Sequence, residues 1–382
     1  MAKNRILATR REWLAGMLPA TALAWGAGAP EGPGWNAVPE ILARIRTPRF
    51  PAREFNIVKF GAKPDGASDA TEAIRNAVEA CAKAGGGAVI VPSGRFLTGP
   101  VHLKSNVHLR LEEGSTLLFS PERSRYLPLV FTRFEGTECM NWSPMVYAFE
   151  QENIAITGKG TLDAQGAAWH PMNREAGAAK RALRAMAAEG VPVEQRIFGE
   201  GHNLRPNAVQ FYRCRNLHIE GVTLRNSPMW TLHLVLSRNI TARGITIHSR
   251  GPNNDGIDPE SCADVLIEDC RFYTQDDGVA IKSGRNHDGR RIGVPSENIV
   301  IRNCVFEKIS RNLFAIGSEV SGGVRNVFME KCRLARGLRG IYVKSNSARG
   351  GVLENLYFRD LDIADVRQPV IRIGMDYGGE KG

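Results

Sequence analysis

A short phrase recurs from about residue 153 onward, and it constrains the fold more than any other feature of the chain. Each copy begins with Asn or Asp and continues with residues that alternate between apolar and polar. Alternation predicts short strands with one buried face, and a return every 23 to 34 residues or so predicts strands that stack coil upon coil. The starting residues are Asn153, Asn216, Asn239, Asp264, Asn298, Asn326 and Asn355.

A second series follows six positions after most of these starting residues. Its members are Val222, Ile245, Cys270, Cys304, Cys332 and Leu361. Because the cysteines occupy the same register as aliphatic residues, we interpret them as rungs of an interior ladder and not as disulfides or metal ligands. The starting residues are interpreted as turn residues that bond to their own or a neighbouring backbone. The predicted class is all-β, a right-handed parallel β-helix.

The segment before the repeats has a different pattern. Residues 55–60 and 88–91 read as strands, and residues 72–84 carry apolar positions at helical spacing after a start at 68–71. A helix here would cap one end of the solenoid and protect its open edge from unwanted pairing. An Ala-, Arg- and Glu-rich stretch at 168–205 interrupts the repeat and predicts a helical insertion that projects from one coil. Residues 31–382 are therefore expected to form a single domain.

Residues 1–30 have the order of an export signal. The twin arginines Arg10 and Arg11 precede an apolar run at 14–25, which is too short to span a membrane, and small residues follow at 26–29. This order predicts a twin-arginine signal peptide and a periplasmic or secreted protein. The competing interpretation is a disordered basic tail ahead of an amphipathic helix. No later apolar run has the length of a membrane span.

The chain carries 50 Lys and Arg against 40 Asp and Glu, a formal net charge of +10. Three of these charges belong to the leader, where four basic residues oppose Glu12 alone, so +7 remains. Such an excess favours an anionic partner: nucleic acid, a membrane surface or an acidic polymer. Nucleic acid is disfavoured because the sequence has no basic–aromatic platform or recognition-helix motif.

Two acidic phrases lie about one coil apart. They are Asn-Asn-Asp-Gly-Ile-Asp at 253–258 and Asp-Asp-Gly at 276–278. Stacking would place Asp255 and Asp276 on adjacent rungs, where crowded carboxyl groups raise one another's pKa. Glycosidic hydrolysis needs such a mixture, one carboxylic acid to protonate the leaving oxygen and one carboxylate to activate water. Simple turns and a Ca²⁺ site are the alternatives.

Several phrases, in this order, resemble glycoside hydrolase family 28, the polygalacturonases, and in particular its bacterial and often exo-acting branch. The resemblance implies a pectin-lyase-like solenoid that hydrolyses an acidic plant polysaccharide or oligogalacturonide and needs no metal or organic cofactor. The phrases are 58–66, the two acidic phrases, Pro-Met-Trp-Thr-Leu-His at 228–233, Ile-Gly-Ser-Glu-Val-Ser-Gly-Gly at 316–323, Gly-Ile-Tyr-Val-Lys at 340–344 and Arg-Gly-Gly at 349–351.

The resemblance also implies catalytic roles for three residues. Asp276 would be the general acid, while Asp255 and Asp277 would hold and deprotonate the attacking water. The mechanism would be a single displacement with inversion. We expect a wider gap between acid and base than in a retaining enzyme, with a water between the rungs.

Substrate binding is assigned by the same resemblance, with two departures. Lys344 matches the lysine that pairs with the sugar carboxylate, and Lys282, His233 and Asp258 are further candidates. Arg311 stands where the family has a histidine, and it is a candidate source of positive charge. Tyr342 stands where the family has an arginine. These departures keep a rhamnogalacturonan-type hydrolase open as an alternative. A polysaccharide lyase and a non-catalytic β-helical glycan-binding module are two further alternatives.

Overall fold

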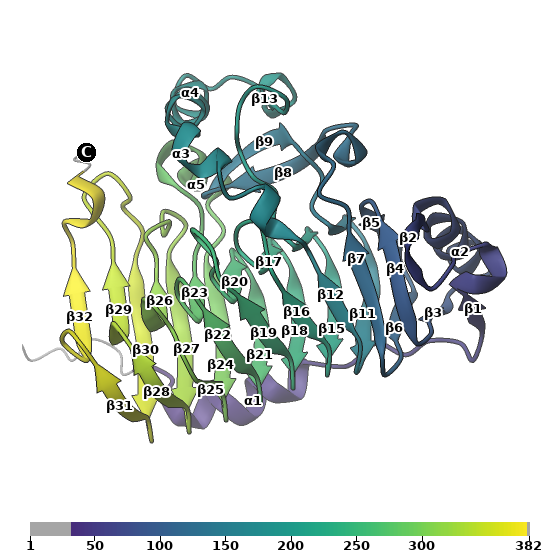
Figure 1. The fold of residues 1–382 in the computed structure, drawn as a ribbon. Coiled ribbons are helices and arrows are strands. Elements are labelled where there is room, and N and C mark those ends of the chain that lie inside the picture. Colours follow the sequence, from purple (N-terminus) through teal and green to yellow (C-terminus); the bar gives the residue numbers. More distant parts are fainter. Residues whose placement is uncertain (1–31, 380–382) are drawn as a thin grey trace, which may run out of the picture.

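The computed structural model describes residues 32–379, so the predicted signal peptide lies outside the described residues. The chain winds into a parallel β-helix, as predicted, whose coils contribute strands to three sheets, although the first coil gives none to the second sheet (Figure 1). The first sheet consists of β1 (Glu54–Asn56), β3 (Gly87–Val91), β6 (Val107–Leu111), β11 (Glu152–Gly158), β15 (Arg215–Glu220), β18 (Arg238–Arg243), β21 (Ala263–Glu268), β24 (Ser296–Arg302), β27 (Val324–Glu330) and β30 (Leu353–Arg359).

The second sheet carries the turns that matter most for function. It consists of β5 (Val101–His102), β10 (Val146–Phe149), β14 (Val209–Tyr212), β17 (Leu232–Val235), β20 (Ile257–Glu260), β23 (Val279–Ile281), β26 (Asn312–Ile316), β29 (Arg339–Lys344) and β32 (Ile371–Gly374). The third sheet consists of β2 (Asp65–Asp69), β4 (Gly94–Thr98), β7 (Ser115–Phe119), β12 (Thr161–Asp163), β16 (Thr223–Arg225), β19 (Thr246–Ser249), β22 (Arg271–Thr274), β25 (Val305–Phe306), β28 (Arg333–Gly337) and β31 (Asp362–Val366).

The interior ladders form as the repeat predicts. Cys304 lies between Cys270 and Cys332 and contacts both, and all seven cysteines of the chain are buried and free. Phe272 and Phe306 stack face to face in the next interior row, with ring centroids 4.5 Å apart. The shared register of the coils therefore aligns like side chains along the axis of the solenoid.

The starting residues behave differently from the prediction. They adopt positive φ angles, as turn residues do, but the side-chain amides of the Asn residues donate to the equivalent position of the preceding coil, and within the described residues only Asn239 also donates to a backbone carbonyl, that of Arg46. Asn216 Nδ2 donates to Asn153 Oδ1 at 2.8 Å, and Asn239 Nδ2 donates to Asn216 Oδ1 at 2.6 Å. An equivalent position in every coil satisfies these amides by stacking, so the residues form a polar ladder, which is interrupted at Asp264 because an aspartate has no amide to donate to Asn239.

Helix α2 (Thr71–Lys83) covers the amino-terminal end of the solenoid, where a capping helix was predicted (Figure 1). It buries Ile74, Val78 and Cys81 in the main core. The strand predicted at 55–60 ends early, because residues 57–60 form the 3-10 helix η2 (Ile57–Phe60). The Asn56 side chain accepts the N–H of Val58 and starts this turn.

Helix α1 (Val38–Arg44) lies along the outer face of the first sheet. It covers an apolar strip of three strands that includes Leu266, Val300 and Phe328. No helix within residues 32–379 is long and apolar enough to cross a membrane.

A small subdomain rises above the turns of the second sheet (Figure 1). It contains the antiparallel hairpin of β8 (Val130–Phe134) and β9 (Thr137–Asn141), and the strand β13 (Ile197–Phe198) that pairs with β9. Its helices are α3 (Met172–Glu175), α4 (Gly177–Ala188) and α5 (Asn286–Ile292). The segment predicted as a helical insertion thus contributes α3 and α4, but the hairpin beside it was not predicted.

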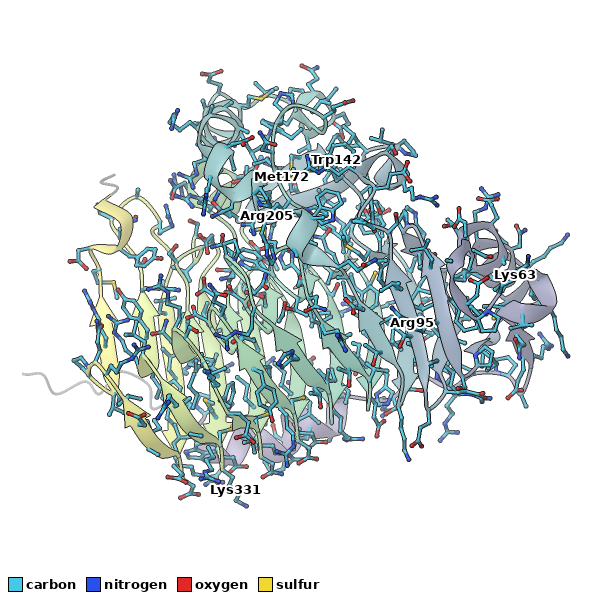
Figure 2. The ribbon with its side chains drawn as sticks, in the orientation of Figure 1. Lys63, Arg95, Trp142, Met172, Arg205 and Lys331 are labelled. Atoms are coloured by element: carbon cyan, nitrogen blue, oxygen red, sulfur yellow. The ribbon has the colours of Figure 1, made fainter. Side chains whose placement is uncertain are left out.

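Arg205 joins this subdomain to the coils below it (Figure 2). The guanidinium is buried and donates to the carbonyl oxygens of Pro228 and Pro252. It also donates to the side-chain oxygens of Asn173 and Asn253, each at 2.8 Å. Because Asn253 opens the first acidic phrase, Arg205 fixes the insertion against the turn that carries Asp255.

Candidate active site

Asp255, Asp276 and Asp277 lie together at the turns that precede β20 and β23. The backbone of Gly256 donates to the Asp277 carbonyl at 3.0 Å, so the two turns are held in register as adjacent rungs. One carboxylate oxygen from each aspartate lies within 4.8 Å of the other two. The stacking predicted from the repeat is confirmed, but the wide gap expected between acid and base is wrong. Adjacent rungs impose a separation close to the strand spacing.

Asp277 is the most strongly held of the three carboxylates. Lys344 Nζ donates to Asp277 Oδ2 at 2.8 Å, and Asn312 donates to Oδ1 from both its backbone and its side-chain amide. Burial opposes ionisation, but the Lys344 charge and these hydrogen bonds outweigh it and lower the pKa of Asp277. Asp277 is therefore the group best suited to remain a carboxylate.

The other two aspartates have raised pKa values. Burial, together with the negative charge of Asp277, raises the pKa of Asp276 to about 6. Burial and the charges of Asp258 and Asp276 raise the pKa of Asp255 well above its usual range. Below a pH of about 6 the trio thus combines the Asp277 carboxylate with a protonated Asp276, which is the mixture that general acid–base catalysis requires.

Lys282 lies among the acidic groups from the neighbouring rung. Its ammonium is 3.7 Å from Asp255 Oδ2, 3.4 Å from Asp258 Oδ1 and 3.7 Å from Glu319 Oε2. It also lies 4.3 Å from the centre of the Trp230 ring, in cation–π geometry. Lys282 therefore lines the site, as predicted, and offsets the crowded negative charge.

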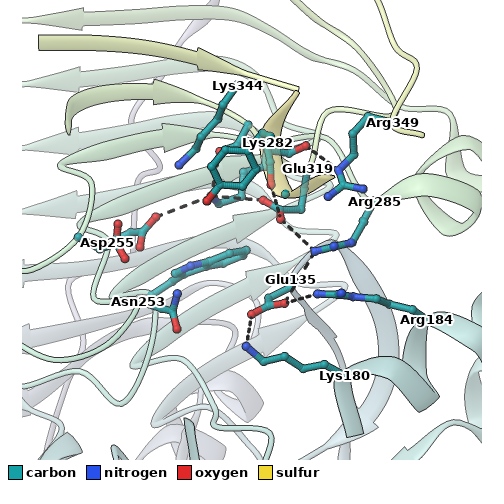
Figure 3. Close-up of a pocket in the computed structure, with 16 residues that line it drawn as sticks. Glu135, Lys180, Arg184, Asn253, Asp255, Lys282, Arg285, Glu319, Lys344 and Arg349 are labelled. Atoms are coloured by element: carbon teal, nitrogen blue, oxygen red, sulfur yellow. Dashed lines mark hydrogen bonds and ion pairs between the residues drawn. The ribbon is translucent and has the colours of Figure 1, made fainter. Parts of the chain in front are cut away.

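A pocket of about 350 Å³ opens above these residues (Figure 3). Its lining is strongly charged, with six cationic side chains beside four carboxylates. The cations are Lys180, Arg184, Lys282, Arg285, Lys344 and Arg349, and the carboxylates are Glu135, Asp255, Asp276 and Glu319. The rest of the wall consists of Trp230, Asn253, Gly317, Ser318, Tyr377 and Gly378.

The subdomain supplies one side of this pocket. Glu135, at the tip of the β8–β9 hairpin, accepts from Lys180 Nζ at 2.6 Å and from Arg184 at 3.1 Å, so the hairpin and α4 meet over the site (Figure 3). None of these three residues was predicted from the sequence. The available signal was Glu135-Gly136 between two alternating runs, a typical hairpin turn.

Arg349 and Glu319 belong to two of the phrases that carry the family resemblance, but no role was predicted for either residue. Burial opposes ionisation of Glu319, yet the charges of Lys282, Arg285 and Arg349 lower its pKa to about 2. Arg349 donates to the Ser318 carbonyl at 2.9 Å and so orders the turn beside Glu319. Both side chains line the pocket.

His233 does not line the pocket, so the prediction that it binds substrate is wrong. Its imidazole is completely buried, and Asn207 and Gln210 donate to Nδ1. Nε2 is therefore the protonated nitrogen and donates to Glu260 Oε2 at 2.7 Å. Trp230 packs against the ring at 4.9 Å and lines the pocket in its place.

Three other predicted binding residues also fail to line the pocket. Asp258 is fully buried behind Lys282, and burial raises its pKa to about 7. Tyr342 is buried and packs edge-on against Tyr377 at 6.2 Å, so Tyr377 presents the ring to the pocket instead. Arg311 is exposed. Its positive charge partly offsets the effects that raise the pKa of Asp276.

Two family models match parts of this chain. A model of glycosyl hydrolases family 28 matches residues 194–382, and one of the rhamnogalacturonase A/epimerase, pectate lyase-like group matches residues 54–110. A hyperthermoactive exopolygalacturonase from Thermotoga maritima is 49% identical and superposes with a TM-score of 0.88, over 91% of this chain and 81% of that one.

Other relatives are more distant. A probable polygalacturonase of Vitis vinifera is 31% identical over 83% of this chain and 62% of its own length. The exo-poly-alpha-D-galacturonosidase of Dickeya chrysanthemi is 24% identical over 86% of this chain and 58% of its own length. The chain thus spans about three-fifths of the length of these two proteins. On the strength of the family model, and of a relative with nearly half its residues identical, the chain belongs to glycoside hydrolase family 28.

Proposed function

We propose that this protein is an exo-acting hydrolase of galacturonate-containing pectic chains. The observation that carries the proposal is the aspartate trio, whose oxygens lie within 4.8 Å of one another, at the base of a pocket lined by six cations. The trio supplies acid and base, and the cations suit a substrate with a carboxylate on its sugar rings. The names of the relatives, which include an exopolygalacturonase and an exo-poly-alpha-D-galacturonosidase, support the same substrate.

The proposed chemistry is a single displacement by water. Asp276, whose pKa is about 6, donates its proton to the glycosidic oxygen as the bond from the anomeric carbon to that oxygen breaks. A water forms the new bond to the anomeric carbon and gives its proton to Asp277. Asp255 lines the pocket and holds this water by hydrogen bonding. One proton enters the leaving group and one leaves the water, so the step balances.

Terminal attack follows from the shape of the pocket. An internal cut needs a groove that is open on both sides of the scissile bond, so that the chain can continue. Here the β8–β9 hairpin and α4 meet through Glu135, Lys180 and Arg184 on one side. A volume of about 350 Å³ is small for a cleft that must hold several sugar units.

The test is hydrolysis of polygalacturonate and, separately, of rhamnogalacturonan, with reducing ends and product sizes followed from the start. Rhamnogalacturonan is included because residues 54–110 match the rhamnogalacturonase A/epimerase model. Asp276→Asn should lower kcat by about 10²- to 10⁴-fold. Asp264→Asn is the matched control, since Asp264 is a starting residue on the first sheet, outside the pocket. Long early products, or equal activity of Asp276→Asn, would contradict the proposal.

We further propose export through the twin-arginine pathway, supported by Arg10, Arg11 and the apolar run that follows them. Replacement of both arginines by lysine keeps the charge but removes the motif. The protein should then remain in the cytoplasmic fraction. Unchanged delivery to the periplasm or medium would contradict this proposal.

A further inference from the structure

A fully buried ion pair lies beneath the pocket wall. Arg133, in β8, and Glu260, at the end of β20, both have side chains with no exposed surface, and their Nη1 and Oε1 atoms are 3.2 Å apart. Burial opposes both charges, but each charge stabilises the other, so the pKa of Glu260 is lowered and that of Arg133 is raised. Neither residue lines the pocket, and the proposed reaction uses neither.

Glu260 holds three separate parts of the structure. Its Oε1 also accepts the backbone N–H of Gly284 at 3.0 Å, and its Oε2 accepts from His233 Nε2. Gly284 lies between Lys282 and Arg285, which both line the pocket. Glu260 therefore fixes the segment that carries two of the pocket cations.

The hairpin is attached to the same segment. The carbonyl oxygen of Gly136, in the β8–β9 turn, accepts the N–H of Arg285 at 3.0 Å. Arg285 Nη1 in turn lies 3.5 Å from Glu319 Oε1 and 3.9 Å from Glu135 Oε2. These contacts form one connected frame, which consists of Arg133, Glu260, Gly284, Arg285 and Gly136. It links β20 to the hairpin directly through Arg133 and again through the segment of Gly284 and Arg285.

A buried ion pair contributes little net free energy to the stability of a fold. Desolvation of two charges offsets most of their attraction, and apolar residues of similar volume often stabilise a core as well or better. The three guanidinium nitrogens of Arg133 have no hydrogen-bond partner among the described residues, so the attraction to Glu260 is what compensates the buried charge and ties β8 to β20. The place of the pair between the solenoid and the hairpin that carries Glu135 makes that link useful for the pocket.

We propose that Arg133 and Glu260 are positioning residues that hold the β8–β9 hairpin over the pocket and so restrict the protein to chain ends. This inference rests on the proposed exo-acting function. If the hairpin moves away from α4 and Arg285, the closed side of the pocket opens. Longer chains can then thread through the site, while short substrates lose the wall that orients them.

The test compares Glu260→Gln and Arg133→Met with Glu268→Gln. Glu268 is the matched control because it is a buried carboxylate in the strand after β20, paired with Arg243 and Arg302 and remote from the pocket. For trigalacturonate, KM should rise about tenfold in the two pocket-side variants with kcat nearly unchanged. Their first products from polygalacturonate should include oligomers that the wild-type protein does not release. Glu268→Gln should keep the wild-type KM and products.

Hydrogen exchange of residues 130–141 provides a readout that needs no activity. Exchange should be faster in the two pocket-side variants than in Glu268→Gln. Unchanged exchange would overturn the positioning role, and faster exchange with wild-type KM and products would overturn the link to chain-end action. If the wild-type protein cleaves no galacturonide, the proposed function fails, but the exchange data still test the frame.

A single substitution leaves one buried charge without its partner, and such a variant can fail to fold. The double variant Arg133→Met/Glu260→Gln removes both charges and keeps one amide oxygen as an acceptor for the Gly284 N–H. We expect it to fold and to show the same altered products. A stable double variant with wild-type products would overturn the proposal.

Discussion

Lys344 Nζ donates a 2.8 Å hydrogen bond to Asp277 Oδ2 across two rungs of the second sheet. The family resemblance implied a role for this lysine in binding the sugar carboxylate. In the structure it lines the pocket and also supports the base of the proposed reaction. The same charge therefore serves substrate binding and the ionisation of Asp277.

We predict that Lys344→Met moves the acidic limb of the activity profile to higher pH. Loss of the ammonium removes the main attraction that lowers the pKa of Asp277, so this carboxyl then takes up a proton at a higher pH. The profile of kcat/KM against pH measures the shift. Lys344→Arg keeps the charge and should keep the limb near its original place. A raised KM with an unmoved limb would assign the lysine to substrate binding alone.

The alkaline limb should report Asp276. Because the acid must be protonated, activity should fall as pH rises through about 6. The positive charge of Arg311 lowers the pKa of Asp276, so Arg311→Ala should move this limb to slightly higher pH. Arg311 does not line the pocket, and its removal should leave KM for acidic oligomers unchanged. A large rise in KM would show that the arginine replaces the family histidine in binding.

Asp276→Asn should stabilise the folded protein at neutral pH. The folded-state pKa of about 6 exceeds the usual value of 3.8, so the folded state binds the extra proton between these values. Stability of the wild-type protein therefore falls as pH rises from about 4 to 6, by roughly 1–3 kcal/mol. Denaturant unfolding should show a gain for the variant at pH 7 that disappears below pH 4 or so. An equal gain at both pH values would contradict the assignment.

The repeat predicted the architecture because every coil places the same residue types at the same positions. The ladder of Cys270, Cys304 and Cys332 and the adjacency of Asp255 and Asp276 both follow from that register. The polar ladder of the starting residues was not predicted. The pattern shows that these residues are turns, but it does not show which partner each amide selects.

The pocket wall could not be predicted in the same way. Glu135 and Lys180 are far apart in sequence and lie outside the repeat, so no periodicity relates them. His233 shows the converse problem. Strand alternation predicts that the His233 side chain points outward. It does not show whether that side chain meets solvent or is buried against Glu260, as it is here. The position of the subdomain determines both which residues form the pocket wall and whether His233 is buried. That position cannot be predicted from the composition of the segment.

The last prediction concerns the stereochemistry of hydrolysis. Carboxylates as close as these are more typical of retaining glycosidases, in which one of them attacks the sugar. Asp277 is fully buried, does not line the pocket and is held by Lys344 and Asn312, so it cannot reach an anomeric carbon. Asp255 does line the pocket, but its raised pKa makes it a poor nucleophile.

A water molecule can bridge the distance between the Asp277 carboxylate and the anomeric carbon. We therefore expect water to attack the sugar, with inversion, despite the short spacing of the carboxylates. Proton NMR of the first turnovers should show the new reducing end with a configuration opposite to that of the cleaved bond. Added methanol should not be converted to a methyl glycoside, since no glycosyl–enzyme intermediate forms. A retained anomer together with methyl glycoside would mean that Asp255 attacks the sugar directly, and the roles of the three aspartates would have to be reassigned.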